Sequence, residues 1–214
     1  AIPTFDEKNR ISLGEGNTPL IKSREIGRQL GLNSLYFKLE TVSPTGSYKD
    51  RFAAFAISHM VKEGKNLCFA TSSGNTGAAL SAYCAAAKIR CVIAVVDGIT
   101  KAKTQQMLSY GAELYEINNF GKDPQVTEKT FELIRKQGES GNASFQISAY
   151  KFSPIGMAGV QKIAFELEKQ LKTINHIFCP AGGGGLTLSI AHGFDNLLYM
   201  KKIDHFPIIH CVQP

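Results

Sequence analysis

The sequence of 214 residues lacks the features that define several specialised protein classes. No apolar run reaches the ~18 residues needed to cross a bilayer, and the N-terminal residues lack the charged and apolar regions of a signal peptide. No run of Lys and Arg exceeds two residues, so the net charge of +6 is scattered and predicts no nucleic-acid partner. The five histidines stand in no ligand spacing, so the sequence predicts no metal site. The lack of a long apolar run predicts no membrane partner.

The cysteines also lack a recognisable pattern. Their number is five, which is odd, and no two of them form C-x-x-C. Four stand among apolar or small residues, which is typical of free buried thiols in a reducing compartment. We therefore expect a cytoplasmic protein. Its 43% hydrophobic and 20% charged residues are ordinary for a globular chain of one large or two small domains.

Short apolar segments alternate along the chain with longer segments of helical periodicity. This alternation predicts an α/β fold with βαβ units and mostly parallel sheets. We expect strands at residues 35–39, 67–70, 91–96, 113–117, 145–147, 174–179 and 207–212, and helices at 48–63, 76–88, 101–110, 124–138, 157–171 and 186–198. Such sheets bind ligands beyond the carboxyl ends of their strands, which directs attention to three unusual loops.

The first loop follows the strand at 35–39 and contains Lys49. Ser47 and Asp50 have the spacing of a capping box, which places Lys49 in the first turn of a helix. The positive field of a helix N-terminus, together with partial burial, lowers the pKa of an ammonium group. A neutral amine is what a Schiff-base lysine needs. A solvated lysine beside Asp50 is the alternative interpretation of this segment.

The second loop, residues 71–77, joins the strand at 67–70 to an alanine-rich helix. It supplies the hydroxyl groups of Ser72, Ser73 and Thr76 and the side-chain amide of Asn75. Backbone N–H groups converge at such a helix start and favour an anion. Ligand binding explains this composition better than a simple capped turn, although the turn remains the alternative.

The third loop contains four consecutive glycines, Gly182–Gly185, followed by Leu186 and Thr187. Such a run is costly in backbone entropy but lets several N–H groups approach a phosphate. Its spacing is neither that of a P-loop nor that of a dinucleotide fingerprint. The three loops together offer an amine, an anion site and a phosphate cradle, and this combination points to pyridoxal 5'-phosphate.

Four ordered motifs resemble those of fold-type II pyridoxal-phosphate enzymes, the tryptophan synthase β superfamily. They are residues 14–20 (GEGNTPL), 44–51 (PTGSYKDR), 72–77 (SSGNTG) and 182–186 (GGGGL). The resemblance implies that Lys49 is the catalytic residue and binds the cofactor as a Schiff base. It further implies that Asn75 contacts the cofactor ring oxygen, that Gly182, Gly183, Gly184, Gly185 and Leu186 hold the phosphate, and that Ser73, Gly74 and Thr76 bind the substrate carboxylate.

The resemblance also implies two lobes and an amino-acid substrate. Residues 45–150 would form the small lobe, and residues 1–44 and 151–214 would be parts of an incomplete large lobe. The first two motifs are most similar to threonine synthases, which convert O-phosphohomoserine to threonine and phosphate. The glycine run resembles serine and threonine dehydratases, and cysteine-synthase-like replacement is a further alternative.

Relatives in this superfamily continue beyond the last predicted strand of this chain. We therefore expect the 214 residues to be a fragment that lacks the residue facing the pyridine nitrogen, with a homodimer as the full-length form. A non-catalytic, truncated lobe is the remaining alternative.

Overall fold

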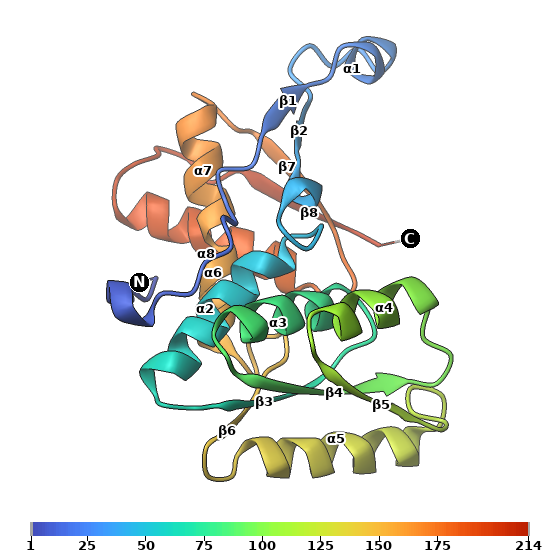
Figure 1. Ribbon diagram of the computed structural model, residues 1–214. Helices are drawn as coiled ribbons and strands as arrows, with labels where there is room; N and C mark the ends of the chain where they lie inside the picture. Colours follow the sequence, from blue (N-terminus) through green and yellow to red (C-terminus); the bar gives the residue numbers. More distant parts are fainter. Residues whose placement is uncertain (1, 214) are drawn as a thin grey trace.

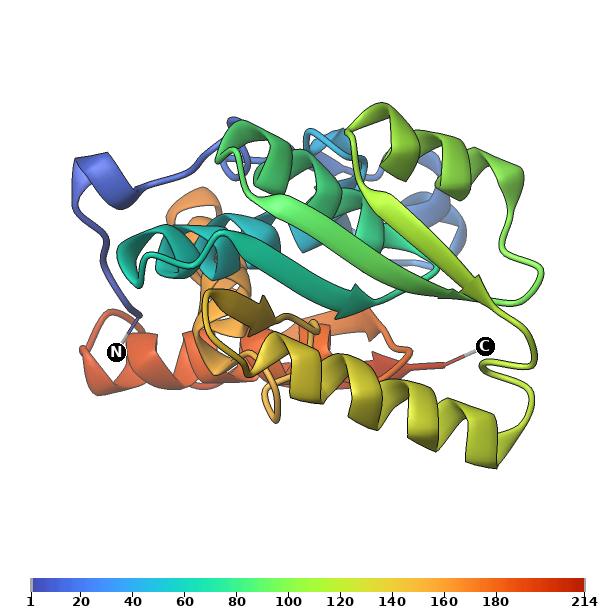
Figure 2. The same ribbon diagram turned by 60° about the horizontal axis from the view of Figure 1, so that its bottom comes forward.

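Four parallel strands form the largest sheet of the structure, a computed structural model that describes residues 2–213. In spatial order they are β5 (Glu113–Ile117), β4 (Arg90–Val96), β3 (Leu67–Thr71) and β6 (Ala143–Phe145). The helices α3 (Asn75–Ala86) and α4 (Lys101–Ser109) cover one face, and α5 (Pro124–Gly138) covers the other (Figures 1 and 2). Each of these helices connects two parallel strands, which confirms the predicted βαβ pattern.

Two small sheets lie on the side of the molecule away from α5 (Figure 1). In one, β7 (His176–Pro180) and β8 (Ile208–Val212) are parallel and are connected by α8 (Gly185–Tyr199). In the other, β1 (Leu20–Lys22) and β2 (Tyr36–Lys38) are antiparallel and are connected through α1 (Glu25–Gln29). The three predicted loops therefore follow strands of three different sheets, not neighbouring strands of one.

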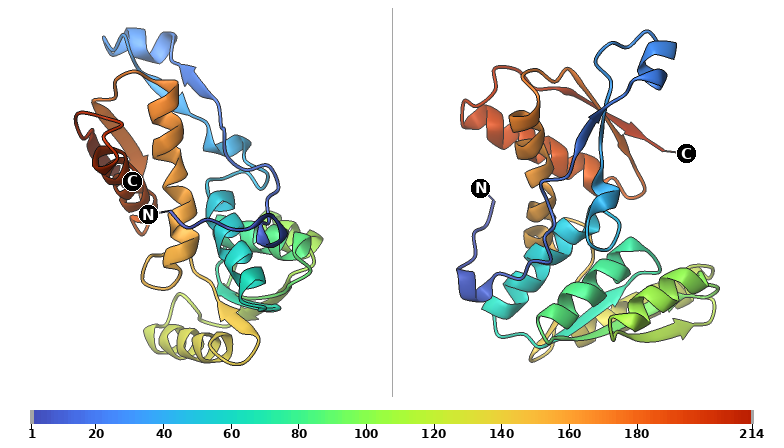
Figure 3. Two further views of the ribbon diagram at one scale, coloured as in Figure 1. Left: turned by 90° about the vertical axis from the view of Figure 1, so that its left-hand side faces the viewer. Right: turned by 45° about the horizontal axis from the view of Figure 1, so that its top comes forward.

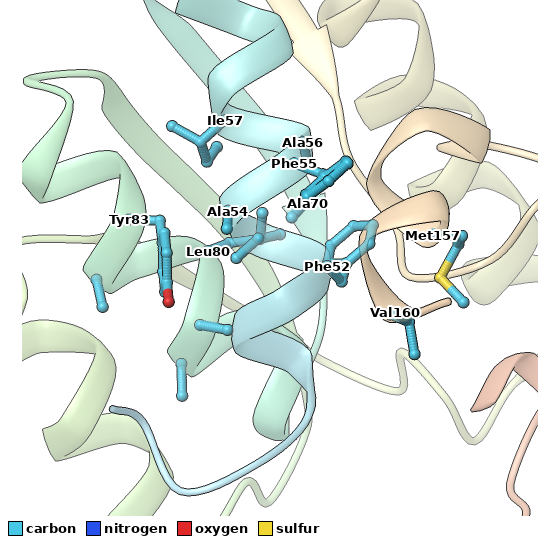
Figure 4. Close-up of a cluster of buried hydrophobic side chains, with 14 of the residues drawn as sticks. Phe52, Ala54, Phe55, Ala56, Ile57, Ala70, Leu80, Tyr83, Met157 and Val160 are labelled. Carbon is cyan, nitrogen blue, oxygen red and sulfur yellow. The ribbon is translucent and has the colours of Figure 1, made fainter. Parts of the chain in front are cut away.

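The helix α2 (Lys49–Lys62) lies in the middle of the fold and is buried along most of its length. It packs against α3 on one side and against α6 (Pro154–Val160) on the other. Figure 4 shows Phe52 of α2 beside the segment that carries Met157 and Val160, with Leu80 and Tyr83 on the opposite side. Only a glycine fits at position 159 of α6, because a Cβ there would meet the carbonyl oxygen of Arg51.

The predicted helix at 157–171 is in fact two helices, α6 and α7 (Lys162–Gln170), which follow one another in Figure 3. Tighter turns flank Gln161, because its N–H donates to Ala158 and its carbonyl accepts from Ala164, three residues away in each direction. Hydrophobic periodicity continues through such a turn, so the sequence pattern did not contain the interruption.

Further differences concern short elements. The strand predicted at 145–147 is β6 at Ala143–Phe145, since the N–H of Ile147 leaves the sheet and donates to the hydroxyl of Ser153. β1, α1 and single 3₁₀ turns at Glu7–Asn9 and Glu40–Val42 were not predicted, being too short to produce a periodic pattern. Within residues 2–213, every helix is too short or too polar to cross a lipid bilayer.

The four-stranded sheet, residues 67–145, falls inside the predicted small lobe at 45–150, and the two small sheets fall outside it. α2 nevertheless packs against helices of both parts. The lobe boundaries after residues 44 and 150 therefore stay a prediction, and the terminal boundaries at Ala1 and Pro214 lie outside the described residues.

Candidate active site

Lys49 is the first residue of α2, as predicted, and its amine is held by two hydroxyl oxygens. The Nζ atom donates to the phenol of Tyr48 and to the hydroxyl of Ser148, at 2.8 Å in each case. Within residues 2–213, no carboxylate forms an ion pair with this amine. Burial lowers the pKa of Lys49 to about 8, so roughly a tenth of the amine is neutral at pH 7.

The capping box predicted at Ser47 and Asp50 is wrong, because their side chains form other hydrogen bonds. The carboxylate of Asp50 accepts from the backbone N–H and the hydroxyl of Thr45, at 2.9 and 2.7 Å. The hydroxyl of Ser47 accepts from the N–H of Lys49 instead of that of Asp50. Asp50 thus fixes the turn before α2, and Lys49 reaches the first helical turn through a different set of bonds.

The hydroxyl groups of the Asn loop, residues 71–77, divide into two kinds. Ser72 accepts from the N–H groups of Gly74 and Gly77, and Ser73 accepts from the N–H of Val96 at the end of β4. The two bonds to Ser72 stabilise the turn itself, and the bond to Ser73 joins the loop to β4. Thr76 differs, because its Oγ1 lies 2.8 Å from the hydroxyl oxygen of Ser148, the partner of Lys49. Asn75 begins α3 with an exposed side chain.

The glycine loop, Gly182–Gly185, has both donors and space for an anion. A Cβ built on Gly182, Gly183 or Gly184 would meet no atom within 4 Å. Their N–H groups donate no hydrogen bond to any group in the described part of the chain. Gly184 has a positive φ of 72° and precedes α8, whose first N–H groups are free by helix geometry. The loop therefore fits a phosphate group by its donors, its room and its helix N-terminus.

Ser148 connects the three loops, and the sequence analysis missed it. Its hydroxyl touches Lys49 and Thr76, and its carbonyl oxygen lies 3.4 Å from a Cβ built on Gly185. Ser148 belongs to no recognised motif. It does follow the strand predicted at 145–147, so the rule that ligands bind beyond the carboxyl ends of strands could have identified it.

The structure thus brings Lys49, Thr76 and Gly185 together around Ser148. The remaining predicted residues of the Asn and glycine loops are their neighbours along the chain. The roles that the resemblance implies for these residues stay predictions.

The first motif and Arg51 have a structural part in the fold. Arg51 is 2% exposed and lies between two carboxylates, with its Nε 2.7 Å from Glu40 and its Nη1 2.6 Å from Glu166. Lys38 donates to Glu166 and to the carbonyl of Thr18 in the first motif. Burial opposes the charge of Glu166, but the hydrogen bonds from Arg51 and Lys38 outweigh it and lower the pKa to about 2. This buried charge cluster joins the N-terminal segment, α2 and α7.

Four of the five cysteines are buried free thiols, as the sequence predicts, whereas Cys211 is exposed. The Sγ atoms of Cys68, Cys84 and Cys91 lie within 4.8 Å of one another in the core of the four-stranded sheet. Their sequence spacing gave no sign of this cluster. A hollow of about 700 Å³ lies along α5 beside Phe152 and has no lining residue from the Asn or glycine loop.

Comparison with known proteins identifies the family of the chain. The profile of the family described as "Pyridoxal-phosphate dependent enzyme" matches residues 11–214. The threonine synthase of Halalkalibacterium halodurans is 32% identical over 196 residues, which are 90% of this chain and 52% of that protein. The threonine synthase of Methanocaldococcus jannaschii is 29% identical over 99% of this chain and 51% of its own length. The chain thus spans about half the length of these curated relatives.

A solved structure of similar fold is a pyridoxal 5'-phosphate-dependent aspartate racemase, with a TM-score of 0.74 and 25% identity. The match covers 92% of this chain and 57% of the racemase. The α/β arrangement, the open glycine loop before α8 and the family match over 204 of the 214 residues (11 to 214) are consistent with one another. The chain belongs to the pyridoxal-phosphate dependent enzyme family, whose cofactor is pyridoxal 5'-phosphate.

Proposed function

We propose that this chain is the cofactor-binding part of an enzyme that catalyses elimination and replacement on an amino acid, in the manner of a threonine synthase. The reaction would convert O-phosphohomoserine and water to threonine and phosphate. The observation that carries the proposal is the meeting of Lys49, Thr76 and Gly185 around Ser148, because one ligand can then reach an amine, an anion site and a phosphate cradle. The two threonine synthases described above support this choice of reaction.

The residues that would hold the cofactor follow from the donors present. Lys49 offers the amine that binds it covalently, and the free N–H groups of Gly182–Gly185 and Leu186 would bind its phosphate. The exposed amide of Asn75 would contact the ring oxygen. When bound, pyridoxal phosphate withdraws electrons from the substrate and so stabilises negative charge at Cα.

The chain itself would bind the substrate and move its protons. Thr76, Ser73 and Gly74 would orient the α-carboxylate at the N-terminus of α3, where the helix field favours an anion. Lys49 would take the proton from Cα, since a pKa near 8 lets its Nζ atom accept and return a proton at neutral pH. Tyr48 and Ser148 would accept hydrogen bonds from the protonated amine.

The first experiment fixes the cofactor on the protein. The chain is incubated with pyridoxal phosphate and reduced with borohydride, and the labelled lysine is located by peptide mass mapping. We expect the label on Lys49 and its loss in Lys49→Met. Lys162 provides an internal control. Burial also lowers its pKa, but its amine lies over the ring of Phe55 and the residue is outside the three loops. Label on Lys162 or on many lysines, with none on Lys49, contradicts the proposal.

The second experiment identifies the reaction from its products. O-phosphohomoserine, serine and threonine are supplied separately, and phosphate, threonine and keto acid are measured. Threonine and phosphate from O-phosphohomoserine support the threonine-synthase assignment. A keto acid from serine or threonine instead assigns dehydratase chemistry, and sulfide-dependent release of cysteine assigns replacement of the cysteine-synthase kind. Cofactor fixation without any turnover supports a binding lobe that is not catalytic by itself.

A further inference from the structure

We propose that Ser148 is a positioning residue: its hydroxyl holds the Lys49 amine at the mouth of the glycine loop and joins it to Thr76 of the Asn loop. This inference rests on the proposed function, since it assigns a further residue to the same site. No motif contains Ser148, and its assignment comes from contacts across 99 positions to Lys49 and 72 positions to Thr76.

The backbone around Ser148 is fixed on both sides. The N–H of Gln146 donates to Phe69 of β3 at 2.8 Å, and the N–H of Ile147 donates to the hydroxyl of Ser153 at 3.1 Å. The N–H of Ala149 donates back to the carbonyl of Ile147 at 2.7 Å. Ser148 is thus the central residue of a three-residue turn that leaves the edge strand β6. Such a turn fixes the backbone angles of its central residue and therefore the direction in which the side chain leaves the backbone.

The direction of the hydrogen bonds follows from the chemistry of the amine. An ammonium group donates only, so Ser148 must accept from a protonated Lys49. Its own O–H is then available to donate to Thr76, whose oxygen lies 2.8 Å away. Since the other oxygen bound by Lys49 belongs to Tyr48 and is also uncharged, Ser148 is one of two neutral acceptors for a half-buried cation. Removal of either acceptor therefore disfavours the charged amine.

The test measures Lys49 in the chain without cofactor. Each variant is labelled with trace acetic anhydride from pH 6 to 10, and acetylation of Lys49 is quantified by mass spectrometry. In Ser148→Ala we expect the pH midpoint of Lys49 labelling to fall by about 0.5 to 1 pH unit, as one hydrogen bond to the cation is lost. Ser148→Thr keeps the hydroxyl and should restore the wild-type midpoint. An unchanged or raised midpoint in Ser148→Ala would overturn the proposal.

Two further variants make the result specific. Ser144→Ala removes a hydroxyl of β6 that bonds to Gln146, and we expect it to leave the Lys49 midpoint unchanged. A shift equal to that of Ser148→Ala would overturn the proposal. Should Ser148→Ala fail to fold, as judged by its thermal melt, Thr76→Val removes the neighbouring hydroxyl alone and should lower the midpoint by a smaller amount. An unchanged midpoint in Thr76→Val would contradict the hydrogen-bonded connection from Thr76 through Ser148 to Lys49.

This experiment separates the inference from the proposed function. Cofactor fixed on Lys49, together with an unchanged labelling midpoint in Ser148→Ala, would leave the function standing and remove the role of Ser148. A lowered midpoint without cofactor on Lys49 would keep the hydrogen-bond role and remove the proposed function.

Discussion

Lys49→Met is expected to make the folded chain more stable at pH 7, because the wild-type fold buries an amine that water would solvate better. Burial lowers the pKa of Lys49 from 10.5 to about 8. Each pKa unit corresponds to about 1.4 kcal/mol, so a full burial penalty amounts to about 3 kcal/mol. Partial access of water and the loss of two hydrogen bonds reduce the expected gain to about 1 to 2 kcal/mol.

The gain must depend on pH in one direction. Below pH 8 the amine is protonated in both the folded and the unfolded chain, and the difference between variant and wild type is largest. Between pH 8 and about 10.5 the unfolded wild type binds more protons than the folded one, so its stability rises with pH. The part of the difference that comes from the charge of Lys49 therefore shrinks over this range and disappears above its upper end.

Urea denaturation of both proteins at pH 7 and pH 10, with a thiol reductant, measures this difference. Lys136→Met removes an exposed lysine of α5 and serves as the matched control for the loss of a surface charge. The reasoning is refuted if Lys49→Met destabilises the chain equally at both pH values, because burial would then not oppose the charge of Lys49.

Three other predictions concern the packing and the loops. Arg51→Met leaves the carboxylates of Glu40 and Glu166 largely buried without their shared cation. It should lower the free energy of unfolding by about 3 to 5 kcal/mol in urea titrations, against less than 1 kcal/mol for the exposed Arg135→Met. The Cβ of Gly183→Ala has open space, so this variant should keep the wild-type melting temperature but bind pyridoxal phosphate more weakly, as measured by absorbance. The Cβ of Gly159→Ala would meet the backbone of Arg51, so this variant should have a lower melting temperature. Equal effects of the two glycine variants on melting would contradict a ligand-binding reason for the glycine loop. Ellman's reagent should titrate one thiol rapidly in the native chain, that of Cys211, and all five in denaturant; rapid reaction of two or more native thiols would contradict the burial of the others.

Local patterns were sufficient to predict most of the secondary structure. The strand at 113–117 and the helix at 124–138 have the predicted bounds, and Asp123 caps that helix by accepting from the N–H groups of Gln125 and Val126. Both signals lie within a few residues along the chain, where periodicity and turn chemistry act. Lys49 in the first turn of α2 and the glycines before α8 are local features of the same kind.

The sequence left open which strands share a sheet. Periodicity says that a segment is a strand, but it contains no information about which strand pairs with it. β2 pairs with β1, β3 pairs with β4 and β6, and β7 pairs with β8, so the three loops follow three sheets. Their meeting depends on the packing of α2 against α3 and α6.

The sequence by itself therefore determined the order of the elements, the position of the Lys49 amine, the glycine run and the family resemblance, because each resides in a short continuous segment. Tertiary structure decided that Ser148 joins Lys49 to Thr76, that Arg51 is buried between Glu40 and Glu166, and that burial is the cause of the lowered pKa of Lys49. These contacts connect residues from 11 to 115 positions apart, and their free energy arises only when separate segments exclude water together.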